Sequence, residues 1–306
     1  MQRAGVTCGE KGVAFNLSKP RARAAPSLIA PLADTNLPEF SNPPVIEVAC
    51  SIQFKPIEGL DTTRLLALAS ELKDRFPDVQ QHPPLPHELE GFDLPAPPRM
   101  SFQLQAPLQL LRWWFINQNG TQLLQVQHDR FTLNWRKLER DDEEYPHYRQ
   151  LRERLVDEYW RFEDFLQGAG LGAPLPDQVE LTYLNHIPAG QPGGPREDVA
   201  RLTKLWGGEP TGTLLAAPAE EVGFAARYVM YDGGETPRGR LYIQLESSYR
   251  FADNSPVYVL QLRGRAAPEG EGLPGAVRSL DRAHRWIVQT FADITTEDKH
   301  RLWGRK

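Results

Sequence analysis

Cysteine, long apolar runs and excess charge are all scarce in this sequence. Only two cysteines, Cys8 and Cys50, occur among 306 residues, so neither a disulfide framework nor a cysteine-based zinc site is expected. No run of about 18 uncharged apolar residues occurs, which argues against a membrane-spanning helix. The formal net charge is −5, which argues against binding nucleic acid by neutralising many phosphates. These absences favour a globular protein of a reducing, cytoplasmic compartment.

Familiar catalytic motifs are also missing. The sequence has no phosphate-binding GxxxxGKS/T loop, no GxSxG nucleophile elbow, no HExxH helix and no GxGxxG before a helix. His82 and His87 lie in a proline-rich stretch without a nearby cysteine, so they are not assigned to a metal site. The sequence therefore predicts no catalytic residue, no cofactor and no metal.

The regular part of the chain follows a segment without periodicity. Residues 1–42 mix glycine, proline and scattered cations, and are predicted to form a flexible tail. Alternating apolar residues in VIEVACSIQF, residues 45–54, indicate a half-buried strand. A helix with a cap at Asp61 is predicted next. Residues 77–99 contain too many prolines for a helix or a central strand and are predicted to be a long loop.

The remaining sequence alternates strand-like runs with two long helices. The runs MSFQLQ, LQLLRWWFIN, TQLLQVQ and FTLNWRK read as an antiparallel meander, before a helix whose apolar stripe runs from Tyr148 to Leu166. The pattern then repeats: a strand at 178–187, a short helix at 196–206, three strands and a final helix. His284 lies on the apolar stripe of that helix, which is typical of a hydrogen-bonded core residue.

The two halves share this order, which indicates an internal duplication. Aligning their strands pairs three polar residues of each half: Glu47 with Glu180, Asn134 with Gln261 and Arg136 with Arg263. We therefore predict an α+β fold with two similar β-α-β(3–4)-α halves, residues 43–172 and 173–306, and an antiparallel sheet with long helices on one face. The order of elements is similar to the duplicated saddle of the TATA-binding-protein type, and a helix-grip protein is the alternative.

Strand alternation places the six paired residues on the helix-free face of the predicted sheet. One interpretation is a solvated surface with cross-strand pairs of glutamate and arginine, each worth well under about 1 kcal/mol. The other is a face that binds a partner or ligand. Catalysis by the two glutamates would require a suitable separation and a raised pKa, which a sequence does not show.

Three stretches carry a resemblance to a known family. VIEVACSIQF, then QVQHDRFTLNWRK with YPHY following, and finally FADITTEDKHRLWG resemble a sporadically distributed prokaryotic family of uncharacterised proteins. The resemblance covers the chain from about Pro43 onward and implies no catalytic residue. The patchy distribution of the family implies a mobile or defence-linked locus.

Two functional hypotheses follow. The first is a non-catalytic binding or regulatory protein that recognises a protein partner through the polar sheet face and the proline-rich loop. The second is a small-molecule binder or enzyme with a pocket between the sheet and a long helix. A pocket larger than about 300 Å³ there would favour the second, and a filled core would favour the first. Binding of single-stranded nucleic acid is disfavoured by the charge, and the oligomeric state is not predicted.

Overall fold

The computed structural model describes residues 29, 36–92, 111–138, 144–192, 194–208, 219–250 and 252–306. Most of the predicted tail and the predicted strand at MSFQLQ lie outside these residues.

A single antiparallel sheet of nine strands organises the described chain. The strands are β1 (Val45–Phe54), β2 (Asp78–His82), β3 (Arg112–Ile116), β4 (Gln122–Gln127), β5 (Arg130–Arg136), β6 (Pro176–Pro188), β7 (Phe224–Tyr231), β8 (Pro237–Tyr249) and β9 (Pro256–Ala266). Their order across the sheet is β2-β3-β4-β5-β1-β6-β9-β8-β7. The predicted α+β class and antiparallel sheet are confirmed.

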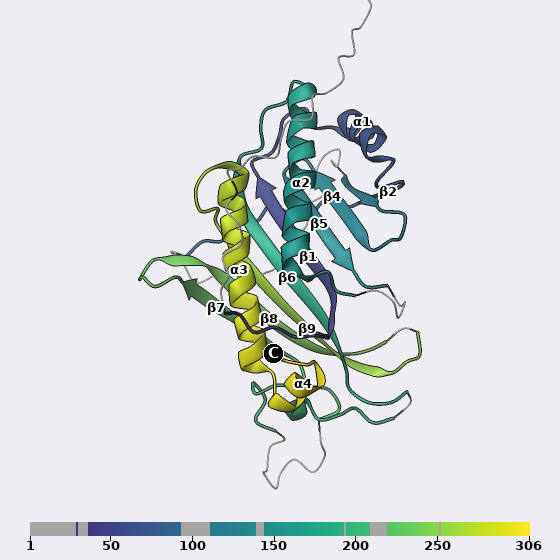
Figure 1. Cartoon of the computed structure of the whole chain (residues 1–306), viewed down its shortest axis with the longest axis vertical. Helices are drawn as coiled ribbons and strands as arrows, with labels where there is room; N and C mark the ends of the chain where they lie inside the picture. Colours follow the sequence, from purple (N-terminus) through teal and green to yellow (C-terminus); the bar gives the residue numbers. More distant parts are fainter. Residues whose placement is uncertain are drawn as a thin grey trace, which may run out of the picture.

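Helices cover one face of this sheet. They are α1 (Thr62–Leu72), α2 (His147–Gly168), α3 (Gly272–Ile294) and α4 (Glu297–Leu302), with a short 3₁₀ helix at Val199–Arg201. Figure 1 shows α2 and α3 side by side across the central strands. Asp61 caps α1 as predicted, because its side chain accepts from the backbone N–H of Arg64 at 3.0 Å.

The core lies between the helices and the sheet. Along β5, Phe131, Leu133 and Trp135 are buried toward α2, as the alternation predicted. Phe131 meets Tyr159 and Phe162 of α2 with ring centroids 5.3 Å apart. Burial of apolar side chains such as these is the dominant favourable term in folding. None of the described helices combines the length and apolar character needed to cross a membrane.

Three local predictions need correction. Asp78–His82 forms an edge strand within the predicted loop, since no proline occurs between Pro77 and Pro83 and an edge strand tolerates proline next to it. The predicted helix at 196–206 is reduced to one 3₁₀ turn. The folded chain also begins before residue 43, because Phe40 is buried against Phe291 at 5.3 Å.

Candidate functional site

The six predicted site residues lie on the helix-free face of the sheet, but they are less exposed than a solvated surface would be. Five of them are half-buried, and Asn134 is 2% exposed. Glu47 on β1 accepts from the Asn134 amide at 2.6 Å, and Asn134 in turn accepts from Gln125 at 2.8 Å. Arg136 donates to the backbone carbonyl of Gly120 at 2.7 Å. The polar set of the first half is therefore bonded mainly within itself.

In the second half the strand register shows which arginine lies opposite Glu180. Glu180 on β6 lies directly opposite Arg265 on β9, and accepts a hydrogen bond from the Arg265 guanidinium. Arg263 lies opposite Thr182, and its guanidinium is 4.9 Å from the ring centre of Tyr242. Arg265, not Arg263, is thus the partner of Glu180. Residues two positions apart lie on the same face, so the alternation of apolar residues predicted the face of Arg263 but could not identify Arg265 as the residue opposite Glu180.

Gln261 lies between two strands of the same half. It is directly opposite Leu184 on β6 and Gln244 on β8. It therefore shares the face with Arg263 but lies two residues farther along β9 from the Glu180–Arg265 pair than Arg263 does. The structure brings Glu180 and Arg265 into one site and leaves Gln261 outside it.

The main feature of this face was not predicted: part of the proline-rich segment lies across it. Residues 83–92, PPLPHELEGF, here called the strap, contact β4, β5, β1, β6, β9 and β8 in turn. Six strands spaced by about 4.8 Å span roughly 24 Å. Seven steps from Leu85 to Phe92 reach about 23 Å when extended. The strap is therefore nearly fully extended, as its three prolines favour.

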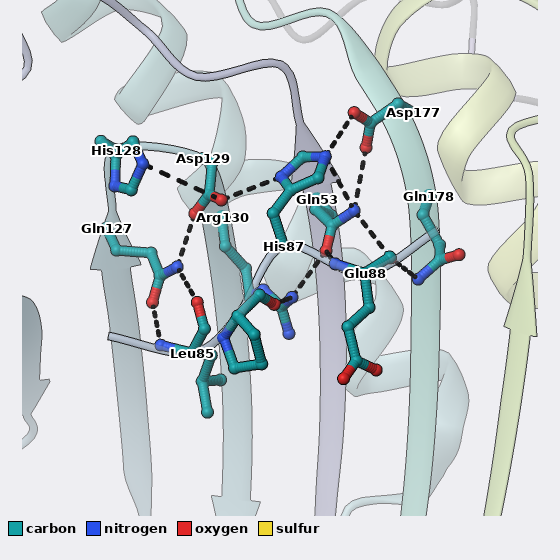
Figure 2. A network of polar contacts seen from close by, with 11 residues as sticks. Gln53, Leu85, His87, Glu88, Gln127, His128, Asp129, Arg130, Asp177 and Gln178 are labelled. Atoms are coloured by element: carbon teal, nitrogen blue, oxygen red, sulfur yellow. Dashed lines mark hydrogen bonds and ion pairs between the residues drawn. The ribbon is translucent and has the colours of Figure 1, made fainter. Parts of the chain in front are cut away.

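Three glutamine side chains hold the strap by its backbone (Figure 2). Gln127 accepts from the N–H of Leu85 and donates to its carbonyl, both at 2.9 Å. Gln53 accepts from the N–H of Glu88 at 3.3 Å and donates to its carbonyl at 3.0 Å. Gln178 donates to that same carbonyl at 2.6 Å and accepts from the N–H of Glu90 at 2.8 Å. These amides imitate the peptide groups of a neighbouring strand.

An acidic position on the sheet receives the histidine of the strap. His87 Nδ1 is 2.9 Å from Asp129 Oδ2, and His87 Nε2 is 3.0 Å from Asp177 Oδ2. Figure 2 shows the imidazole held between these two carboxylates. The Asp129 side chain is only 2% exposed. Because a buried carboxylate is stable only with donors nearby, Asp129 creates a demand for a donor at this point of the strap.

A basic position receives the two glutamates of the strap. Arg240 on β8 lies directly opposite Arg265 on β9, and each side chain is 7% exposed. Two buried like charges facing each other are destabilising without counter-ions. Glu88 accepts from Arg265 at 2.7 Å, and Glu90 accepts from Arg240 at 2.7 Å while lying 3.6 Å from Arg265.

The charge pattern also shifts the pKa of Glu90. Burial alone would raise it, but hydrogen bonds from Tyr242 and Arg240 and the positive charge of Arg265 outweigh burial and lower it. The contribution of this carboxylate to stability is therefore present above the pKa of the unfolded chain. It is lost as pH falls through the lower pKa of the folded state.

The sequence predicted that the proline-rich segment is a loop, but it did not predict that part of this segment lies across the sheet. The prolines at 83, 84 and 86 predict an extended segment, whereas its docking depends on residues up to 177 positions apart, such as Glu88 and Arg265. The only available signal was the presence of glutamines such as Gln53 on the helix-free face of the strands, because a glutamine there needs a partner when it is buried. Among the described residues, no histidine, cysteine and carboxylate cluster is arranged to hold a metal ion.

Comparisons with known proteins leave the site to be interpreted on its own geometry. No protein-family model, curated protein or solved structure matches the chain. The resemblance to a sporadically distributed prokaryotic family stays a prediction.

Proposed function

We propose that this protein is a non-catalytic binding module that recognises an extended segment of a protein partner on the helix-free face of its sheet. In this structure the strap, a segment of the same chain, occupies that face. The observation that carries the proposal is the set of glutamines Gln53, Gln127 and Gln178, which bond to backbone N–H and carbonyl groups alike. Side-chain amides arranged in this way bind any extended backbone, as strand addition to a sheet edge does.

Charge complementarity defines which segment fits. The Asp129 and Asp177 carboxylates accept a donor side chain, and Arg240 and Arg265 accept two carboxylates beyond it. A matching partner segment thus presents a histidine or a cation, with acidic residues at the first and third positions after it, as His87, Glu88 and Glu90 do in the strap. Electrostatic complementarity of this kind contributes specificity more than affinity.

The strand order supports a duplicated plan for the two halves. Strands β1 and β6 lie together at the centre, with β5, β4 and β3 outward on one side and β9, β8 and β7 outward on the other. Glu47 and Glu180 each face an arginine on the next outward strand, Arg136 and Arg265 respectively. In this proposal the strap uses polar groups from both halves, so neither half forms the site alone.

The proposal is tested with the strap peptide supplied in trans. A fluorescent peptide with the sequence of residues 83–92 is titrated onto the full chain carrying Glu88→Gln and Glu90→Gln. The substitutions weaken the internal strap, which otherwise competes at an effective concentration of about 1 mM. We expect saturable binding, and at least tenfold weaker binding of a control peptide with glutamine at both glutamate positions. Thermal unfolding confirms that the variant is folded, and the single Glu90→Gln variant serves if it is not.

Two results would contradict the proposal. One is the absence of saturable binding of the peptide to the folded variant at concentrations up to about 1 mM. This result would show that the strap is only a structural element. The other is equal binding when Gln53 and Gln178 are both replaced by leucine, because the proposed backbone recognition depends on their amides.

A further inference from the structure

A second site lies on the opposite side of the sheet. A cavity of about 340 Å³ is bounded by β6, the start of α2, the second half of α3 and the chain segment before β1. It exceeds the size of about 300 Å³ above which a pocket favours the second hypothesis of the sequence analysis, a small-molecule site between the sheet and a long helix. The strap and the cavity lie on different faces, so both sites exist in one molecule.

Three hydrogen-bonded side chains provide the polar groups of the cavity. The hydroxyls of Tyr145 and Tyr183 are 2.9 Å apart, and the Tyr183 hydroxyl is 3.1 Å from His284 Nδ1. His284 Nε2 has no hydrogen-bond partner among the described residues. Because His284 lines the cavity, its free nitrogen is available to a ligand there.

The geometry of His284 is fixed before any ligand binds. Its ring stacks on Tyr148 with centroids 4.0 Å apart and planes 13° apart, and Tyr183 lies at 6.0 Å. The Tyr148 hydroxyl donates to Asp281 at 2.9 Å, and Arg152 donates to the same carboxylate at 2.8 Å. A preorganised binding group loses little conformational freedom on binding, which favours affinity.

The interior of the cavity is neutral, whereas charges lie at its rim. Burial lowers the pKa of His284 to about 3 and raises the pKa values of Tyr145 and Tyr183, so all three side chains are uncharged near neutral pH. The charged residues that line the cavity, Glu39, Arg149 and Lys306, are all exposed, and Glu39 pairs with Lys306 at 3.5 Å. A charged ligand group would lose its hydration inside without a counter-ion.

We infer that this cavity binds a neutral, planar aromatic molecule with a single hydrogen-bonding group directed at His284 Nε2. Planarity follows from the aromatic walls, to which Phe40, Phe291, Tyr145 and Tyr183 contribute. Neutrality follows from the uncharged interior. A purely structural role for His284 would explain its bond to Tyr183, but it would not explain the cavity that this side chain lines.

The test uses 2-naphthol and its anionic counterpart 2-naphthoate as probes in isothermal titration calorimetry on the full chain at neutral pH. We expect 2-naphthol to bind at least tenfold more tightly than 2-naphthoate. His284→Phe should weaken 2-naphthol about tenfold through loss of one hydrogen bond. The matched control is His186→Phe, which makes the same change on the other face of β6 and should leave binding unchanged.

A blocking variant separates cavity binding from binding elsewhere. Val288→Trp places a large ring at the cavity wall and should abolish binding, and Leu262→Phe serves if the first variant does not fold. Absence of 2-naphthol binding to the wild type, or unchanged binding in a folded blocking variant, would overturn the assignment of the cavity. Equal affinity for 2-naphthoate, or unchanged affinity in His284→Phe, would overturn the assigned ligand class.

Discussion

Replacing Glu90 with alanine measures how firmly the strap is held. Both side chains of the Glu90–Arg240 pair are less than one-tenth exposed, and Tyr242 also donates to Glu90. Without this carboxylate, Arg240 faces Arg265 across the strand pair with one counter-ion fewer. Removing one partner of a buried ion pair destabilises a protein by about 3–5 kcal/mol. We expect about 3 kcal/mol, because Arg240 retains its bond to the carbonyl of Gly91 at 2.7 Å.

The assay is urea unfolding followed by tryptophan fluorescence, arranged as a double-mutant cycle. Glu90→Ala, Arg240→Ala and the double variant are compared with the wild type, and we expect a coupling energy of about 2 kcal/mol. The control is Glu39→Ala, which removes the exposed pair with Lys306. It should change the free energy of unfolding by less than about 1 kcal/mol.

A further variant, Glu90→Ala combined with Glu88→Gln, shows whether the strap detaches from the sheet or stays docked. If Glu90→Ala releases the strap, water solvates Arg240, and adding Glu88→Gln causes no further loss of stability. If the strap stays docked, the losses in the free energy of unfolding caused by the two substitutions add together. A coupling energy between Glu90 and Arg240 within about 0.5 kcal/mol of zero would refute the view that this ion pair anchors the strap.

Three further predictions concern the helix-covered side and the sheet itself. Burial, with the charge of neighbouring Asp164, raises the pKa of Glu163 to about 7. This folded-state pKa lies above the unfolded value, so ionisation of Glu163 destabilises the fold as pH rises. In urea unfolding, Glu163→Gln should be more stable than the wild type by about 1 kcal/mol at pH 8, after allowance for solvent screening. Near pH 4 the two proteins should be equally stable. Trp135→Ala should lower the free energy of unfolding by about 3–5 kcal/mol, whereas Arg136→Ala should lower it by about 1 kcal/mol or less, and a reversed order would contradict the assigned faces. Burial raises the pKa of the Cys50 thiol to about 12, so in a chain whose other cysteine is replaced by serine a thiol reagent should label it only at the rate of unfolding.

The alternation of apolar residues in strands and their spacing in helices predicted much of this architecture, because apolar residues occupy the buried face of each element. The stripe of α2 from Tyr148 to Leu166 is buried as expected, and so are Phe131, Leu133 and Trp135 on β5. Each of these assignments depends only on neighbours within one element. Element type and facing direction were therefore accessible from the sequence.

Features that join distant segments were not accessible. The sequence alignment paired Arg136 with Arg263, whereas the arginine directly opposite Glu180 is Arg265, two residues away, and a period of two cannot distinguish those positions. The docking of the strap depends on several long-range bonds that no local pattern encodes. The cavity beside His284 likewise depends on how α2, α3 and the segment before β1 pack together. Its histidine was correctly predicted to be hydrogen-bonded, but the open volume was not predicted.

The buried polar groups of the helix-free face indicate what that face was selected to hold. An apolar strap could have been covered by apolar strand positions, with no need to satisfy amides or charges. Instead, Gln53, Gln127 and Gln178 are each at most 4% exposed, and each both donates to and accepts from the backbone of the strap. An extended backbone supplies that combination at regular intervals regardless of its side chains. The glutamines therefore favour a polypeptide as the occupant, while Asp129 and the facing Arg240 and Arg265 restrict which polypeptide it is.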